Sequence, residues 1–269
     1  MTPDTYSHGH HESVLRSHTW RTAENSAPHL IGLLEPGRSL LDVGCGPATI
    51  TADLARRVAP GPVVGIDASA DVVVGAVDTL GEDLPDNLDL RTGDVYDLAF
   101  DDGSFDIVHA HQVLQHLSDP VAALRQMRRV LRPDGVLAVR DSDYAGFFWW
   151  PADVRLDRWL DIYHRITACN GAEADAGRRL PEWVAAAGFS DLRVTSSTWT
   201  FADPDSRSWW GGLWADRVLL SAFAEQAVAY GLADRAELEE LARGWRSWAE
   251  APEGVFVTPH VEVIAGQVT

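Results

Sequence analysis

The sequence predicts an α/β fold: a doubly wound, mostly parallel sheet with helices at the N-terminus and an inserted helical cap. Short apolar runs alternate with helical patterns from about residue 39 to 140, as in successive βαβ units. The first run leads into two glycines, Gly44 and Gly46. Two later stretches, 144–176 and 203–252, hold eight of the eleven tryptophans and have no place in such a sheet. We interpret them as the cap.

Five strands are expected in the alternating part, each short and apolar because a parallel sheet is covered on both faces. Helices fit between these strands, and Arg132-Pro133-Asp134-Gly135 is a clear stop and turn after the last helix. The expected strands are Ser39–Val43, Pro62–Ile66, Leu88–Arg91, Phe105–Ala110 and Val136–Asp141, and the expected helices are Ala48–Ala59, Ala70–Gly81 and Pro120–Leu131.

The flanking segments complete the predicted fold. Pro259 is expected to place an edge or a bulge in the closing strand, since proline cannot donate to a ladder. We divide the chain into an N-terminal helical lid, 1–38, and a main domain, 39–269, that carries the cap insertions. The flanking elements are one or two helices in Glu12–Leu34, a helix at Arg178–Ala187, a sixth strand at Leu192–Phe201 and the closing strand at Gly254–Gly266.

The charge and the basic residues exclude several functions. The formal net charge is −18, and all 22 basic residues are arginine. The absence of lysine excludes a Schiff-base enzyme, a Walker-type phosphate lysine and a lysine general base. The strong negative charge argues against a nucleic-acid partner, because phosphate binding depends on clustered cations.

The cysteines and the hydropathy indicate a cytoplasmic protein. Cys45 and Cys169 cannot form a disulfide framework and suit a reducing compartment. No apolar run approaches the length of a membrane span, and the N-terminal residues have no signal-peptide apolar region. We therefore expect no membrane partner.

The strand ends carry the strongest functional signal. Gly44 and Gly46 permit backbone angles or a close ligand approach that a Cβ would block. Asp67 ends the second expected strand, where a carboxylate can bind ribose hydroxyls. A dinucleotide site would need a third glycine where this sequence has Thr49, which disfavours the alternative of an NAD(P)-dependent oxidoreductase.

Four segments resemble the class I S-adenosylmethionine-dependent methyltransferases. LLDVGCGPATIT resembles their first motif, VVGIDAS the second, GDVYDLAF the third and FDIVHAHQVLQHL the fourth. RRVLRPDGVLAVRD resembles the helix, turn and fifth strand that follow, so the likeness covers about 39–141 closely. Ala48 stands where the family usually has a third glycine; alanine is small enough to keep the turn.

The resemblance implies S-adenosylmethionine as the cofactor and assigns residues to it. The glycine turn would lie against the methionine part, and Asp67 would hold the ribose hydroxyls. Asp94 would accept from the adenine amino group, although it could instead be a helix-cap or turn acid. The cofactor residues implied in this way are Arg21, Gly44, Cys45, Gly46, Asp67, Ala68, Ser69, Asp94, Val95 and Gln112.

The N-terminal segment is rich in histidine. A metal site there lacks a regular ligand spacing and any cysteine or acid pair, so we expect no metal; a solvated tail is the other plain alternative. The segment resembles the N-terminal helices of methyltransferases related to ubiquinone and menaquinone biosynthesis, especially their relatives in bacterial secondary metabolism. There the leader closes over the cofactor, which would bring Tyr6 and His10 to the methyl group and Arg21 to the cofactor carboxylate.

A proton must leave when the acceptor atom is an OH, an NH or a ring carbon. With lysine absent, histidine is the natural base near neutral pH. The candidates are His10, His111 and His116, with Tyr6 as a relay, although His116 could simply cap or pack a helix start. His109 lies inside the fourth strand and is expected to be a core histidine. The catalytic residues we predict are Tyr6, His10 and His111.

The tryptophan-rich cap suggests the acceptor. Aromatic side chains suit a flat apolar acceptor, although each could equally pack the cap onto the sheet. We expect a small aromatic natural product, with an indole ring as one candidate, and leave open a homodimer and a non-catalytic relative that only binds the cofactor. The acceptor residues predicted are Tyr144, Phe147, Trp150, Trp210 and Trp214.

Overall fold

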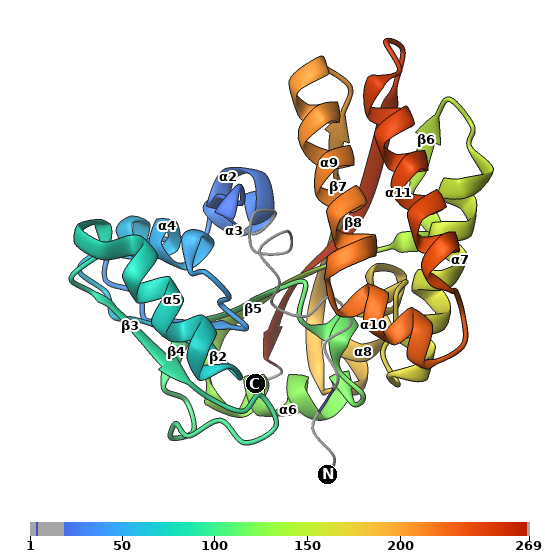
Figure 1. The fold of residues 1–269 in the computed structure, drawn as a ribbon. Coiled ribbons are helices and arrows are strands. Elements are labelled where there is room, and N and C mark those ends of the chain that lie inside the picture. The colour runs from blue at the N-terminus through green and yellow to red at the C-terminus, as the bar shows by residue number, and fades with distance from the viewer. Residues whose placement is uncertain (1–3, 5–18, 268–269) are drawn as a thin grey trace.

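Five parallel strands form the half of the sheet that contains the glycine turn (Figure 1). The computed structural model describes residues 4 and 19–267. The strand order is β3-β2-β1-β4-β5-β8-β6, with β7 on β8, and β8 runs antiparallel to its neighbours. This arrangement confirms the predicted doubly wound, mostly parallel fold. The strands are β1 (Leu40–Val43), β2 (Val63–Asp67), β3 (Leu88–Thr92), β4 (Phe105–His111), β5 (Leu131–Ser142), β6 (Phe148–Trp150), β7 (Phe189–Phe201) and β8 (Val255–Gln267).

Two predicted strands start at least three residues earlier than expected: β5, and β7, which begins at Phe189 and not at Leu192. β5 begins at Leu131 and not at Val136, because Leu131 pairs with Phe105 before the register between β4 and β5 shifts. The expected turn at residues 132–135 therefore lies within the strand bounds, at this irregularity.

Helices cover both faces of the sheet. Side chains alternate in β1, so that Leu41 and Val43 pack under α6 and α8, while Leu40 packs under α3 and α4. No helix within residues 19–267 is long and apolar enough to cross a membrane. The helices are α2 (Ala23–Ser26), α3 (Pro28–Ile31), α4 (Thr49–Val58), α5 (Ala70–Leu80), α6 (Pro120–Val130), α7 (Val154–Cys169), α8 (Ala176–Ala186), α9 (Pro204–Leu220), α10 (Ala222–Ala229) and α11 (Arg235–Glu250), with 3₁₀ turns η1 (Gly81–Asp83), η2 (Leu114–His116) and η3 (Tyr144–Gly146).

The helical region expected at Glu12–Leu34 is broken in its described part. Two four-residue helices, α2 and α3, stand there. Thr22 caps α2 by accepting from the backbone N–H of Asn25, and Pro28 is the first residue of α3, where its missing N–H costs nothing.

A second core lies above the end of the sheet. β7 and β8 are 13 residues each and project beyond β5, and α7, α9, α10 and α11 gather around the projecting ends (Figure 1). Phe256 of β8 is fully buried among them. Five tryptophans of the stretches interpreted as the cap are buried in this core: Trp159, Trp210, Trp214, Trp245 and Trp248.

The expectation for Pro259 was wrong. β8 is an interior strand, paired with β7 on one edge and with β5 and β6 on the other, and its register with β7 runs through Pro259 without a bulge. The carbonyl of Pro259 accepts from the N–H of Asp143, just after β5 ends. The missing donor of the proline therefore faces the gap between β5 and β6, where no ladder partner needs it.

Candidate active site

A cavity of about 820 Å³ extends from the glycine turn to the helices above the sheet. The first strands, the segment before α2 and the projecting ends of β7 and β8 all contribute to its wall. It brings together most of the site residues that the sequence predicted. Those that line it are Arg21, Gly44, Cys45, Gly46, Asp67, Ala68, Ser69, Asp94, Val95, His111, Gln112, Tyr144, Phe147, Trp210 and Trp214.

The glycine turn is fixed by backbone bonds and by close packing. The N–H groups of Gly44 and Cys45 both donate to the carbonyl of Ile66, at 2.8 and 2.9 Å. Gly44 has φ +70°, and a Cβ there would lie 2.4 Å from Cγ2 of Val113. Only glycine can therefore hold this turn between β1 and the loop after β4.

A buried acid supports the turn from below. Asp42 accepts from Oγ1 of Thr51 at 2.5 Å and contacts Nδ1 of His109 at 2.7 Å. These bonds tie β1 to α4 and to β4. The fully buried His109 thus is a core histidine, as predicted.

Two acids stand at the ends of β2 and β3. Both oxygens of Asp67 accept backbone N–H groups, Oδ2 from Gly46 at 3.1 Å and Oδ1 from Ser69 at 3.0 Å. Asp94 accepts from the N–H of Tyr96 at 2.8 Å, which is the turn contact that the sequence left open. Both residues line the cavity, so each carboxylate combines a backbone role with exposure to a ligand.

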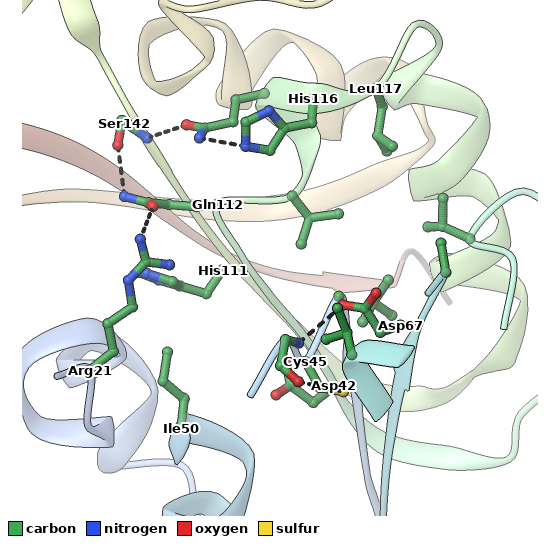
Figure 2. A pocket seen from close by; sticks show the side chains of 18 of the residues that line it. Arg21, Asp42, Cys45, Ile50, Asp67, His111, Gln112, His116, Leu117 and Ser142 are labelled. Carbon is green, nitrogen blue, oxygen red and sulfur yellow. Dashed lines mark hydrogen bonds between the residues drawn. The ribbon is translucent and has the colours of Figure 1, made fainter. Parts of the chain in front are cut away.

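Gln112 is the hub of a polar chain across the cavity (Figure 2). Its backbone is left-handed, with φ 54°, a strained conformation for a non-glycine residue of the kind found at functional sites. Its Oε1 accepts from Nη2 of Arg21 at 2.7 Å, and its Nε2 donates to Oγ of Ser142 at 2.7 Å and lies 2.9 Å from Nε2 of His260. The amide thereby joins the segment before α2 to β5 and β8.

His111 lies beside Arg21 in the same view (Figure 2). It is 7% exposed and lines the cavity, and neither ring nitrogen has a hydrogen-bond partner among the described residues. Burial, and after it the charges of Arg140 and Arg21, hold the pKa of His111 well below its usual range. The ring is therefore neutral near pH 7, and both of its nitrogens are buried.

His116 is the last residue of the 3₁₀ turn η2, so it does not stand at the start of an α-helix. It also lines the cavity. Its Nε2 lies 3.0 Å from Nε2 of Gln115, whose amide must be the donor. Burial and Arg21 lower the pKa of His116 to about 3. This ring too is neutral near pH 7.

Aromatic side chains form the far wall. Tyr144 stacks on Phe147 with ring centroids 4.3 Å apart. Trp210 and Trp214, both from α9, are 6% and 1% exposed and reach the cavity from the helical core. Tyr144 is also stacked on Tyr163, with ring centroids 4.1 Å apart, so these side chains form an apolar far wall whose rings already pack on one another.

The structure contradicts one predicted acceptor residue. Trp150 is 60% exposed and is not part of the cavity wall. The edge strand β6 turns its side chain outward, while its carbonyl accepts from Nε1 of Trp248 at 3.1 Å. The predicted Tyr6 and His10 lie outside the described residues.

Sequence reasoning missed Trp199, which lines the cavity together with Arg21 and His260. Its Nε1 donates to the carbonyl of Asn25 at 2.7 Å. Its ring lies 5.3 Å from the guanidinium carbon of Arg21, 4.8 Å from that of Arg140 and 4.4 Å from the ring of His260. Its place near the end of an expected strand was the only signal, because these partners are far away in sequence.

A buried ion pair lies behind Trp199. Nε of Arg140 is 3.4 Å from Oε1 of Glu262, and both side chains are at most 4% exposed. Oγ of Ser197 donates to the same Glu262 oxygen at 2.5 Å. The pair and the serine join β5, β8 and β7 behind this part of the cavity.

Sequence reasoning also missed Arg217 of α9, which lines the cavity and is 4% exposed.

The residues present fit S-adenosylmethionine. The glycine turn is a cradle that a Cβ would fill, and the carboxylate of Asp67 stands at the adjacent strand end. Beyond it, Arg21 supplies a cation suited to a ligand carboxylate, and the whole cavity continues to an aromatic wall. Such a crevice at the carboxyl ends of the strands is where open α/β sheets bind ligands.

Comparisons with known proteins agree with this fit. The family described as "Methyltransferase domain" matches residues 34–184. An uncharacterized methyltransferase of Schizosaccharomyces pombe is 32% identical over 267 residues, which is 96% of this chain and 95% of the relative. Nocamycin O-methyltransferase of Saccharothrix syringae is 30% identical over 205 residues, 71% of this chain and 73% of the relative.

A solved structure with this fold contains the cofactor product. Phosphoethanolamine N-methyltransferase 2 of Haemonchus contortus, in complex with phosphomonomethylethanolamine and S-adenosylhomocysteine, aligns with TM-score 0.58 and 14% identity over 96% of this chain and 58% of the nematode chain. Fold and site together define an S-adenosylmethionine-binding α/β enzyme. The chain belongs to the class I S-adenosylmethionine-dependent methyltransferases.

Proposed function

We propose that this methyltransferase acts on a small aromatic natural product, bound between the glycine turn and the aromatic wall. The observation that carries the proposal is the single cavity that joins Gly44 to Tyr144, Trp210 and Trp214. The relative named for nocamycin, a small molecule, supports an acceptor of this size. An indole ring is one candidate for the flat apolar part of this acceptor.

Cofactor contacts follow from the residues at the turn. S-adenosylmethionine, when bound, supplies the methyl group on its sulfonium. In our proposal Asp67 accepts from the ribose hydroxyls, Asp94 and the N–H of Val95 bind the adenine, and Arg21 binds the amino-acid carboxylate. Cys45, Ala68, Ser69 and Gln112 complete this wall.

We propose that residues 1–38 act as a lid. The described residues on either side of the segment 5–18 both contact the cavity wall: Asp4 accepts from Oη of Tyr96 at 2.6 Å, and Trp20 packs on Trp199 at 5.3 Å. Closure by this segment would exclude water and bring Tyr6 and His10 to the acceptor.

His111 would accept a hydrogen bond from the acceptor and hold the attacking atom toward the methyl group. Its neutral ring meets the first requirement of a base. Burial, and after it the charges of Arg140 and Arg21, disfavour the imidazolium, so a full proton transfer to His111 would be costly. Positioning in line with the sulfonium then supplies much of the rate.

The free thiol Cys169 and the buried Cys45 are compatible with a cytoplasmic setting.

The test is methyl transfer from labelled S-adenosylmethionine to a panel of bicyclic phenols, indoles and aromatic acids, with S-adenosylhomocysteine release as the readout. We expect turnover with at least one member, and His111→Gln to lower kcat far more than affinity for S-adenosylhomocysteine. Trp214→Leu should raise KM, while the matched Trp150→Leu should leave both constants unchanged. Cofactor binding without turnover on any acceptor would support the non-catalytic alternative.

A further inference from the structure

Ser142 stands where the glycine-turn end of the cavity meets the aromatic far wall. It is the last residue of β5, lines the cavity and is 2% exposed. Tyr144 of the far wall follows two residues later. From the opposite side, Gln112 reaches Ser142 from the loop after β4, and the next residue of that loop, Val113, lies against the glycine turn. Ser142 therefore lies at the junction between the proposed cofactor site and the proposed acceptor site.

Arg21 fixes the orientation of the Gln112 amide (Figure 2). A guanidinium has donors and no acceptor, so the atom of Gln112 that lies 2.7 Å from Nη2 of Arg21 must be the carbonyl oxygen Oε1. The amide nitrogen Nε2 then faces Oγ of Ser142 at 2.7 Å and Nε2 of His260 at 2.9 Å, which uses both of its hydrogens. Nε2 of His260 accepts one of them, so Nδ1 carries the proton of this ring.

The Ser142 hydroxyl consequently keeps its own hydrogen for another partner. Its oxygen accepts from Gln112, and its backbone N–H donates to Oε1 of Gln115 at 3.2 Å. His260 lies opposite Ser142 in the ladder between β5 and β8, but its Nε2 already accepts from Gln112. No other described residue accepts the hydroxyl hydrogen. A buried donor without a partner is costly, and the cavity is the side from which a ligand can supply one.

An oxygen nucleophile can accept this hydrogen bond during methyl transfer, and a nitrogen nucleophile cannot. A hydroxyl oxygen has two lone pairs. One forms the bond to the methyl group while the S–CH₃ bond breaks and leaves its electron pair on sulfur, and the other accepts from Ser142. The proton of the hydroxyl is released along its hydrogen bond to His111 as the oxygen becomes positive, and passes to water. An amine has one lone pair, which the methyl group takes, so the Ser142 donor would stay unpaired.

We infer that the methylated atom of the acceptor is an oxygen that accepts a hydrogen bond from Oγ of Ser142, and that Gln112 positions this donor. The inference rests on the proposed function and narrows its substrate class to hydroxyl and enol acceptors. A site built to hydrogen-bond one group rejects an analogue that leaves the buried partner unpaired. Ser142 thus selects the nucleophile by its number of lone pairs, and charge has no part in the selection.

The tautomer of His260 tests the arrangement without any acceptor. Long-range ¹H–¹⁵N NMR spectra of the protein saturated with S-adenosylhomocysteine, assigned with the variant His260→Gln, should show the Nδ1–H form. The Nε2–H form would mean that Oε1 of Gln112 faces Ser142 and takes its proton, which would overturn the inference.

Matched acceptors test the selection itself. Turnover of 2-naphthol would be compared with that of 2-naphthylamine, and 5-hydroxyindole with 5-aminoindole, at saturating S-adenosylmethionine, and the methylated atom located by NMR. We expect the methyl group on oxygen, and Ser142→Ala to lower the hydroxyl-to-amine ratio of kcat/KM roughly ten- to a hundredfold. The intrinsic reactivity of each acceptor cancels between the two proteins. Methyl transfer mainly to nitrogen or carbon, or an unchanged ratio, would overturn the inference.

Gln112→Glu tests the positioning role. A carboxylate still accepts from Arg21, but it would take the Ser142 proton instead of donating to the hydroxyl, and it would reverse the His260 tautomer to Nε2–H. We expect the loss in ratio seen in Ser142→Ala and no further loss in the double variant; additive losses would refute positioning by Gln112.

Controls separate these outcomes from misfolding and from failure of the proposed function. Ser247→Ala, at an exposed position on α11, should leave the ratio unchanged. Each variant is checked by thermal unfolding and by S-adenosylhomocysteine binding. Failure of the wild-type protein to bind S-adenosylhomocysteine, or to methylate any acceptor, would refute the proposed function and the inference with it, whereas selective methylation of nitrogen would refute the inference alone.

Discussion

Replacing Gly44 by alanine tests the geometry of the glycine turn most directly. The left-handed backbone, φ +70°, costs an L-residue about 1–2 kcal/mol. The new Cβ would lie 2.4 Å from Cγ2 of Val113, and overpacking of this kind costs about 1–3 kcal/mol. We therefore expect Gly44→Ala to lower the free energy of unfolding by about 2–5 kcal/mol in all, and to weaken S-adenosylhomocysteine binding because the cradle must shift.

Denaturant unfolding and calorimetry would measure the two effects. Adding Val113→Ala should relieve the steric part only, so a double-mutant cycle should give a coupling free energy of about 1–3 kcal/mol. Gly75→Ala is the matched control: it lies within α5 with nothing within 4 Å of an added Cβ, and should stabilise by roughly 0.5–1 kcal/mol. An unchanged unfolding free energy and affinity in Gly44→Ala would refute the described turn.

Three further predictions concern single side chains. Asp67→Ala should weaken S-adenosylhomocysteine binding by roughly 1–3 kcal/mol in calorimetry; an unaltered affinity would place the ribose elsewhere. His116 has a folded-state pKa of about 3, below its unfolded value of about 6.5, so its contribution to stability is present above pH 6.5 and is lost as pH falls toward 3. Relative to His116→Gln, the wild-type protein should therefore lose about 1.4 kcal/mol of unfolding free energy per pH unit in that window, and parallel pH profiles would contradict the buried neutral ring. Trp199→Phe removes the bond to the carbonyl of Asn25 and should cost about 1 kcal/mol or more in unfolding free energy, whereas Trp150→Phe at the surface should stay within about 0.5 kcal/mol.

The part of the fold and site that the sequence predicts well depends on local signals. A strand, a glycine turn and a helix follow each other within about twenty residues around Gly44, so chain order alone places Asp67 at the neighbouring strand end. Every described residue expected to contact the cofactor lines the cavity. The backbone at Ala48 also explains why the family usually has glycine at this position. Its φ is 59°, a left-handed conformation that glycine adopts without a steric cost.

The remainder depends on contacts between distant segments, which leave no local pattern. Trp150 and Trp210 look alike in sequence, yet one lies on an outward edge strand and the other on a helix over the cavity. The proline at position 259 led to the prediction of an edge strand. The sheet tolerates it in an interior strand because β5, more than a hundred residues earlier in the chain, stops before it reaches Pro259. Trp199 and Arg217 gain their roles only when β7 and α9 meet the N-terminal segment and the cavity.

The length of β7 and β8 has a consequence for motion. After a register shift between Ser190 and Arg193, their ladder runs without a break from Arg193 to Phe201, from the sheet into the helical layer. A hinge between the two halves of the cavity would have to bend this ladder and break its hydrogen bonds. We therefore expect acceptor exchange to proceed without rigid-body domain closure, and the amides paired between β7 and β8 to exchange equally slowly in the free and the cofactor-bound protein.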